Sequence, residues 1–538
     1  MNLRDALAVL SKSSPYAVTT SGEIKDPELK AIKDYLYVET DVEIAFKKKL
    51  DELNPGEILF LCGSSGDGKS EILTRNEKNY RNKVSFHLDA THSFHPDENA
   101  IVTLDNVFSE WKSHSHPLVV GINIGMLANY EREGNEIHRE IRMAMRSFLN
   151  DGIEKVEGKY HFIDFERFPK FTFSGESISA PFLSSLVRQV VADDKKNKFR
   201  EYFNREYDER PTSNSEKKKL ISNYLILRDT GVQKAIIELV LNARLKRDQF
   251  ITARMMLDFI YRILTGEKHI YDNIFEGGEN EILQAIAEFD PITKRTRSLD
   301  QFVLNRTLGL PDDKFTTYRE EAHQKFLIDS RGKANPTSIV RQLYLFRYTT
   351  FENKYANNFI KDFESAEESI YREAWHLHND YDGSQDVRKK LKAFYDNTIL
   401  PAISGYANRK AAYLSKDEFY LSSKGIYDFA SEVDIGVSYQ KIAREKLKEI
   451  SHFNLHLTIN DTPIHPIPVN MNLIQVFIAI VSGYRPNRFD KNSIVLLDEI
   501  VSHITEVANR SRSLLLFLNG NRLAKIKESD DELKVSGL

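Results

Sequence analysis

The chain has 538 residues, and at roughly 100–200 residues per domain this length indicates two to four domains. Apolar residues make up 41% and charged residues 29%, which excludes a disordered or collagen-like chain. The formal net charge is −4, so no global basic field points to nucleic acid, although a local basic patch is not excluded. The single cysteine, Cys62, excludes an internal disulfide and argues against a cysteine zinc site.

The first part of the chain predicts a parallel α/β sheet. Helical spacing of apolar residues begins at Leu3 and again at Thr40, and the apolar run 57–62 then predicts a buried strand. Similar runs follow, separated by helical patterns over 101–111 and 137–149. These runs cover 84–89, 118–123 and 160–165. Strands that alternate with helices are typical of an α/β fold.

The strand signal fades after about residue 175. Helical patterns dominate the next part, and the last ninety residues or so contain two predicted hairpins, one near 453–469 and one over 514–526 around Asn519-Gly520. We therefore divide the chain into an α/β domain, a helical lid, a helical region and a C-terminal α+β region. Their bounds are 1–175, 176–270, 271–450 and 451–538.

No segment is long enough for a membrane span. The most apolar segment, Leu473–Val481, falls well short of the ~18 residues required. The apolar stretch at the N-terminus is too short and interrupted for a secretory signal. We expect a soluble, cytoplasmic protein with no membrane partner.

One motif carries clear chemistry. The pattern G-x-x-x-x-G-K-S is matched without a mismatch between the predicted strand 57–62 and a predicted helix at 71–80. Its residues are Gly63, Ser64, Ser65, Gly66, Asp67, Gly68, Lys69 and Ser70. In such a loop, backbone N–H groups and a helix N-terminus bind phosphate. Lys69 would reach the β- and γ-phosphates and the Ser70 hydroxyl would hold Mg²⁺, so the sequence predicts a site for ATP and Mg²⁺.

Hydrolysis also needs an acid near the metal, at the end of an apolar strand. Asp89 ends the second predicted strand and is preferred over Asp164 near the end of the fourth, with a plain solvent contact as the alternative. Asp498 follows the apolar run Ile494–Leu497, but the helical spacing there predicts an amphipathic helix. The run before Asp105 is likewise predicted to be a helix.

Two further polar residues are candidates for nucleotide chemistry. Asn123 ends the third predicted strand, where AAA-type ATPases place a residue that contacts the γ-phosphate or the attacking water; capping of the next helix is an equal alternative. Arg254 opens an apolar helix, where AAA-type folds place a nucleotide-sensing arginine, although a surface arginine is commoner. Arg167, just past the fourth strand, is a weaker candidate for an arginine finger.

Two other clusters give weaker signals. A zinc site is conceivable at His87, Asp89, His92 and His95, but hydrogen-bonded histidines are far commoner. Among the basic clusters, 294–297 is the best candidate for a phosphate contact. Solvated helix faces explain most of the others.

At CGSSGDGKSEILTR (62–75), FHLDATHSFHPDE (86–98) and LVVGINIGMLANY (118–130), the chain resembles the DptF (DndF) family of DNA phosphorothioation-dependent restriction proteins. The resemblance implies a bacterial P-loop NTPase subunit that works with two partner proteins. That complex attacks DNA that lacks the phosphorothioate modification of its backbone. On the family's pattern, Gly63–Ser70 carries the nucleotide, with Asp89 and Asn123 beside it.

We therefore expect an α/β P-loop NTPase domain of AAA-like type, a helical lid, and a mainly α-helical C-terminal region that carries small β-hairpins. The leading function is ATP hydrolysis that gates or powers a DNA restriction complex, with DNA contacted mainly through the partners. The alternatives are a nucleotide-switch assembly protein with little turnover, another signalling ATPase, and a metal-dependent nuclease. Assembly into a homo-oligomer is left open.

Overall fold

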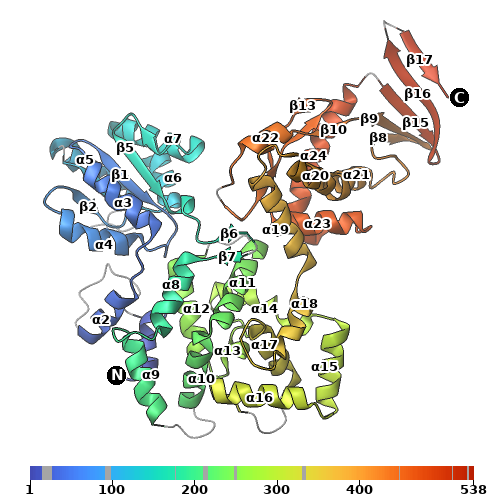
Figure 1. Ribbon diagram of the computed structural model, residues 1–538. Helices are drawn as coiled ribbons and strands as arrows, with labels where there is room; N and C mark the ends of the chain where they lie inside the picture. The colour runs from blue at the N-terminus through green and yellow to red at the C-terminus, as the bar shows by residue number, and fades with distance from the viewer. Residues whose placement is uncertain are drawn as a thin grey trace. The chain divides into compact units, whose positions relative to one another are not determined.

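The computed structural model describes residues 1–14, 27–90, 99–114, 116–175, 177–209, 216–247, 251–329, 335–447, 449–511, 513–529 and 532–537. It is a mixed α/β structure of two compact units (Figure 1). One comprises Met1–Arg244 with Gln249–Phe363, and the other comprises Leu245–Asp248 with Glu364–Leu538. Within the described ranges, no helix is long and apolar enough to cross a membrane.

A five-stranded sheet organises the start of the first unit. Its strands are β1 (Ile58–Cys62), β2 (Ser85–His87), β3 (Leu118–Ile122), β4 (Lys155–Val156) and β5 (Tyr160–Asp164). The order is β2-β3-β1-β5-β4, with β1 parallel to both β3 and β5, and β2 parallel to β3. The four predicted strands and their parallel arrangement are thereby confirmed, whereas the short antiparallel strand β4 was not predicted.

Alternate residues of β1 face two separate apolar cores, because side chains alternate along a strand. Ile58 and Phe60 pack with helices α5, α6 and α7, whereas Leu59 and Leu61 pack with α3 and α4. These helices are α3 (Asp41–Glu52), α4 (Lys69–Tyr80), α5 (Ala100–His114), α6 (Ile124–Glu133) and α7 (Arg139–Asp151). Both faces of the sheet are covered, which explains why the central strands β1 and β3 are continuous apolar runs in the sequence.

A helical region completes the first unit. Its helices include α8 (Pro181–Val191), α9 (Lys198–Asp208), α10 (Glu216–Arg228), α11 (Thr230–Arg247), α12 (Ala253–Thr265), α13 (Ile270–Asn273), α14 (Glu281–Ala287), α15 (Arg297–Thr307), α16 (Asp313–Phe326) and α17 (Pro336–Leu345). An unpredicted hairpin of β6 (Thr172–Ser174) and β7 (Ser177–Ser179) precedes α8.

The first residues of the chain belong to this helical region. Helix α1 (Leu3–Leu7) packs on α9, where the Leu3 N–H donates to the Glu206 carboxylate at 2.7 Å. The Lys12 N–H donates to the Asp258 carboxylate of α12 at 2.9 Å. Helix α2 (Pro27–Leu36) packs on α8. The chain therefore starts among the helices and enters the sheet domain only at α3.

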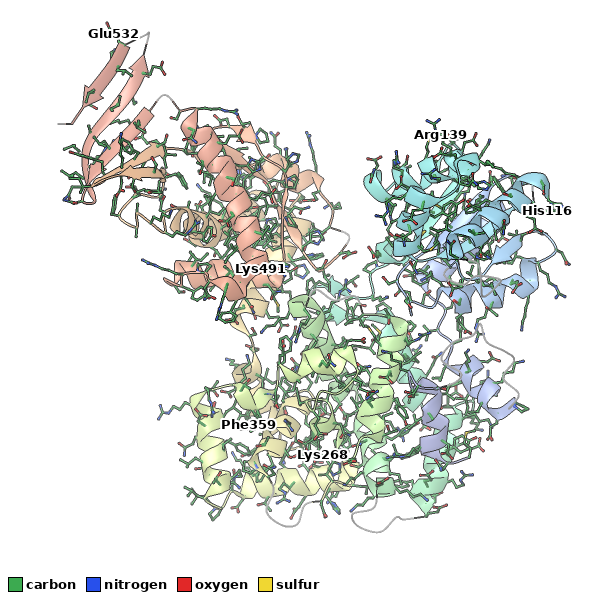
Figure 2. The ribbon with its side chains drawn as sticks, turned by 180° about the vertical axis from the view of Figure 1, so that it is seen from behind. His116, Arg139, Lys268, Phe359, Lys491 and Glu532 are labelled. Atoms are coloured by element: carbon green, nitrogen blue, oxygen red, sulfur yellow. The ribbon has the colours of Figure 1, made fainter. Side chains whose placement is uncertain are left out.

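The second unit is richer in strands than expected. Its larger sheet has the order β17-β16-β15-β9-β8. The strands are β8 (Glu418–Lys424), β9 (Tyr427–Glu432), β15 (Ser513–Leu518), β16 (Asn521–Ser529) and β17 (Glu532–Ser536). The hairpin predicted around Asn519-Gly520 is confirmed, with φ values of +49° and +80° that suit a tight hairpin turn. Figure 2 labels Glu532, the first residue of β17.

A mainly helical C-terminal region with only small hairpins was expected. The structure corrects this expectation, because the region contains a five-stranded sheet. Strands β8 and β9, with β10 (Ile435–Val437), fall in the stretch 271–450 that was predicted to be mainly helical. The second half of β8 is polar and exposed, so it lacks the alternating apolar pattern that identifies a strand.

The rest of the second unit combines short strands with helices. Near 453–469, β11 (Phe453–Leu455) pairs with β14 (Ile467–Val469), and β12 (Leu457–Ile459) pairs with β13 (Thr462–Pro463). Helix α18 (Ile360–Phe363) ends the first unit. The helices of the second unit are α19 (Ala366–Asn379), α20 (Gln385–Phe394), α21 (Leu400–Ala407), α22 (Tyr439–Arg444), α23 (Met471–Val481) and α24 (Lys491–Asn509). The predicted hairpin is thus present, although each of its arms is divided.

Candidate functional site

The loop Gly63–Gly68 joins the central strand β1 to the N-terminus of α4. Gly66 and Gly68 have φ values of +86° and +103°, which residues with a side chain rarely adopt. Gly68 is the N-cap of α4 and, within the described structure, no side chain caps this end of the helix. The first N–H groups of α4 are therefore not satisfied by a capping side chain, and a helix end of this kind favours an anion.

The side chain of Lys69 folds back onto the loop. Its Nζ donates to the carbonyl oxygens of Gly63 at 2.9 Å and Ser64 at 2.7 Å. Burial lowers the pKa of Lys69, while the negative charges of Asp67 and Asp89 act in the opposite direction. The ammonium group is thus held on the loop by carbonyl oxygens that a stronger anionic partner could replace.

Asp67 is a buried carboxylate inside the loop, with a side chain only 5% exposed. Its Oδ2 accepts from the Ser64 N–H at 2.7 Å, and its Oδ1 accepts from the Lys170 Nζ at 2.5 Å. Lys170 follows the short helix η4 (Phe165–Arg167), beyond β5. Lys170 lies 103 positions from Asp67 and belongs to no motif, so nothing in the sequence marks it as part of this site.

A cavity of about 400 Å³ lies beside the loop, a size typical of small-molecule sites. Its polar and glycine lining comprises Ser11, Lys33, Thr40, Ser65, Gly66, Asp67, Gly68, Lys69, Ser70, Glu71, Asp89, Asn123 and Arg254. Its apolar lining includes Val9, Leu10, Leu36, Tyr37, Val38, Phe182, Leu186 and Leu257. The cavity therefore combines a charged part at the loop with an apolar wall contributed largely by the helical region.

The structure brings the four predicted catalytic residues together. Lys69, Asp89, Asn123 and Arg254 all line this cavity, and so does Ser70. Asp89 and Asn123 follow strands β2 and β3, which run parallel to β1. Because the carboxyl ends of parallel strands meet at one edge of a sheet, residues from distant parts of the sequence converge beside the loop.

Asn123 caps the helix that it precedes. Its Oδ1 accepts from the Met126 N–H at 2.6 Å at the start of α6. The capping interpretation is thus confirmed, and the residue also lines the cavity. Capping uses only the amide oxygen, so the NH₂ group is the part of Asn123 suited to contact a ligand.

Arg254 lies where the helical region touches the loop. Its backbone N–H donates to the Gly66 carbonyl at 3.2 Å, and Thr252 caps α12 by accepting from the Met255 N–H at 3.3 Å. A Cβ atom at Gly66 would lie 3.2 Å from the Thr252 Oγ1 and 3.3 Å from the Arg254 Cβ. The N-terminus of α12 therefore packs closely on the loop, and any larger residue at Gly66 would push them apart.

Two weaker candidates are engaged elsewhere. Asp164 caps η4 by accepting from the Glu166 N–H at 3.1 Å, and among the described residues it is not part of the cavity wall. Arg167 pairs with Glu154 and donates to the Gly152 carbonyl. Neither side chain is directed to the loop by these contacts.

The two acids that were rejected from the sequence do lie on helices. Asp105 is in α5 and accepts from the Tyr130 hydroxyl at 2.6 Å. Asp498 is in α24 and accepts from the Tyr406 hydroxyl at 2.8 Å. The helical interpretation of both runs is confirmed.

The histidine and basic clusters give no separate site. His92 and His95 lie outside the described residues, and in the remainder of the chain no group of three or more His, Cys, Asp or Glu is arranged to hold a metal ion. In the basic cluster 294–297, Arg295 pairs with Asp300 at 3.3 Å on an exposed surface. That contact agrees with a solvated helix face.

Comparison of the chain with protein-family models, with curated proteins and with solved structures found no match in any of the three.

Proposed function

We propose that the chain is an ATPase, built on an α/β P-loop domain of AAA-like type, and that the cavity beside Gly63–Ser70 binds ATP with Mg²⁺. The observation that carries the proposal is the shared cavity. Lys69 and Ser70 of the motif line it together with Asp89, Asn123 and Arg254. This set includes a cation, a hydroxyl, an acid, an amide and a second cation, which are the groups that phosphoryl transfer uses.

The loop would hold the phosphates. The uncapped N-terminus of α4 supplies N–H groups and positive potential. Lys69 would exchange the carbonyl oxygens of Gly63 and Ser64 for the β- and γ-phosphates, since a charged oxygen is the stronger acceptor. Arg254 would add positive charge from the helical side of the cavity, where charge develops during transfer.

Ser70 and Asp89 fit a magnesium ion. Both residues line the cavity and carry side-chain oxygen atoms, and Mg²⁺ prefers oxygen ligands and is commonly held by one or two protein groups with phosphates and water. When bound, the metal supplies charge neutralisation on the phosphates. The NH₂ group of Asn123 would orient the attacking water or contact the γ-phosphate.

The apolar wall suits the base of the nucleotide. Val9, Leu10 and Leu257 come from the helical region and Tyr37 from the segment that leads into α3. Such side chains bury the faces of a planar ring while polar groups elsewhere fix its orientation. The charged and apolar parts of the cavity thus match the two ends of a nucleoside triphosphate.

The biological setting is proposed from the resemblance to the DptF (DndF) family. Each of the segments 62–75, 86–98 and 118–130 contributes residues to the cavity lining. The chain would act in the cytoplasm with two partner proteins of a phosphorothioation-dependent restriction complex. ATP hydrolysis would gate or power attack on unmodified DNA, and DNA would be contacted mainly through the partners, given the net charge of −4.

The test is ATP turnover by the purified chain and its Lys69→Ala variant, with and without unmodified duplex DNA. Wild type should hydrolyse ATP and Lys69→Ala should lose turnover by about 10²-fold or more, the typical cost of removing a group that stabilises the transition state. Lys78→Ala, on the exposed part of the same helix, is the matched control and should keep wild-type turnover.

The outcomes separate the rival functions. ATP binding without turnover in wild type would favour the nucleotide switch, or a site completed by a partner protein. A wild-type chain that binds no nucleotide would overturn the proposal. DNA cleavage by the chain alone would revive the nuclease alternative.

A further inference from the structure

The loop proposed to hold phosphates contains a negative charge of its own. Asp67 is buried at the middle of the loop and lines the same cavity as Lys69 and Ser70. A bare carboxylate at this place would repel a triphosphate and would itself be unstable away from water. Something must therefore compensate Asp67 for the loop to accept an anion.

Lys170 supplies the compensation from outside the motif. Its Nζ donates to Asp67 Oδ1 at 2.5 Å, while the other carboxylate oxygen accepts from the Ser64 N–H at 2.7 Å. Lys170 is itself largely buried, with a side chain 22% exposed. The pair thus closes a small network that ties the first turn of the loop to the segment beyond β5.

We infer that Lys170 is a positioning residue for nucleotide binding: it neutralises Asp67 and so lets the loop accept the phosphate groups. The inference rests on the proposed function. The role is indirect, because Lys170 acts through the Asp67 carboxylate and the Ser64 N–H rather than on the nucleotide. With both partners present, the charges of Asp67 and Lys170 cancel, and Lys69 is left as the net positive charge of the loop.

The phosphate groups are the part of the ligand whose binding should depend on Lys170. Loss of Lys170 leaves one uncompensated negative charge beside the phosphates, and its repulsion grows with the charge of the ligand. ATP binding should therefore weaken most, ADP binding less, and adenosine binding least. A merely structural role would weaken binding of all three ligands to a similar extent.

The experiment measures dissociation constants of ATP, ADP and adenosine by titration calorimetry on the full chain with Mg²⁺. Lys170→Met should raise the ATP dissociation constant by about tenfold or more, since an unpaired buried charge is costly. Lys170→Arg, which keeps the charge, should stay near wild type. Lys159→Met, an exposed lysine before β5, is the matched control and should bind like wild type.

Recovery of ATP affinity in a double variant is the decisive test. Asp67→Asn removes the negative charge but keeps an oxygen that can accept from the Ser64 N–H. The double variant Asp67→Asn/Lys170→Met, which removes both charges together, should therefore return ATP affinity to within about threefold of wild type. The double variant, which leaves neither charge without its partner, keeps the inference testable if Lys170→Met alone does not fold.

Two results would overturn the inference while leaving the proposed function intact. One is wild-type ATP affinity in Lys170→Met. The other is a double variant that binds ATP no better than Lys170→Met, or, where Lys170→Met does not fold, a double variant that has lost ATP affinity. A wild-type chain that binds no nucleotide would overturn both proposals together.

Discussion

Asn123 shows, at the scale of one residue, how a single side chain can serve both the fold and the proposed chemistry. Its oxygen caps α6 through the Met126 N–H, and the residue lines the cavity at the end of β3. The sequence left capping and nucleotide contact as equal alternatives. The geometry is compatible with both, because the two roles use different atoms of the amide.

Substitution can separate these roles. Asn123→Ala should lower the free energy of unfolding by about 1 kcal/mol through loss of the cap, and it should also reduce ATP turnover. Asn123→Ser keeps a capping oxygen but has no NH₂ group, so it should restore stability without restoring turnover. Thermal unfolding and steady-state turnover measure the two effects, and wild-type turnover in Asn123→Ser would limit Asn123 to its structural role.

The two acids at strand ends can be distinguished in the same way. Asp89 lines the cavity, whereas Asp164 caps η4. Asp89→Asn should raise the Mg²⁺ concentration needed for half-maximal turnover by roughly 10- to 100-fold, the range found for groups around metal sites. Asp164→Asn should leave this concentration unchanged, and a larger Mg²⁺ effect in Asp164→Asn than in Asp89→Asn would reverse the assignment.

At the scale of elements, strand β3 depends on a glycine. A Cβ atom at Gly121 would lie 2.5 Å from the Leu73 side chain of α4 and 2.6 Å from the Leu88 carbonyl oxygen. The Gly121 carbonyl also accepts from the Ala90 N–H at 2.9 Å, directly after Asp89. The absence of a side chain at Gly121 therefore lets α4 and the end of β2 approach β3, which brings Asp89 toward the loop.

Gly121→Ala should destabilise the protein by about 1–3 kcal/mol, because the core around it has no room for another methyl group. Gly125→Ala is the matched control: its Cβ would meet only the Asn123 Oδ1, at 3.4 Å, and it lies in helix α6. That control should be neutral or stabilising by up to about 1 kcal/mol. Denaturant unfolding measures the free energy of unfolding of both variants. Equal values for Gly121→Ala and Gly125→Ala would contradict the steric argument.

The sequence predicted those elements whose own residues carry the signal. Strands β1 and β3 are buried along their whole length, so each is a visible apolar run, such as 118–123. The motif 63–70 is likewise local. The sheet of β8 and β9 was missed because its partner β15 lies about 85 residues later in the chain and half of β8 is exposed. Lys170 could not be found either, because its role depends on a contact with distant Asp67.

At the scale of the whole molecule, buried histidines make stability depend on pH. Burial lowers the pKa of His138 and His161 in the first unit, and lowers the pKa of His378 in the second to about 4. These side chains stay neutral in the folded protein, whereas an unfolded chain takes up protons below about pH 6.5. Stability is therefore greatest above pH 6.5 and falls as the pH drops toward 4.

Protonation linked to His378 alone should lower the free energy of unfolding by about 3 kcal/mol between pH 6.5 and pH 4. Its Nδ1 is bonded to the Ala374 carbonyl at 2.7 Å and its Nε2 to the Tyr395 hydroxyl at 3.0 Å. Calorimetric melting from pH 7.5 to 5 should show a falling Tm, with a shallower slope in His378→Gln. His116→Gln, at the exposed position labelled in Figure 2, should keep the wild-type slope, and a pH-independent Tm would refute the argument.

The chain enters the α/β domain from α2 and leaves it for α8, so two covalent tethers join that domain to one helical scaffold. The first tether is anchored where Gln189 of α8 donates to the Tyr37 carbonyl at 3.0 Å. Non-covalent contacts also join the two parts: the Arg254 N–H donates to the Gly66 carbonyl at 3.2 Å, and Lys33 of α2 pairs with Glu71 of α4 at 3.2 Å. Since Leu36, Tyr37 and Val38 of this tether line the cavity together with the loop, a molecule bound there would contact both parts and add to the interactions that hold them together.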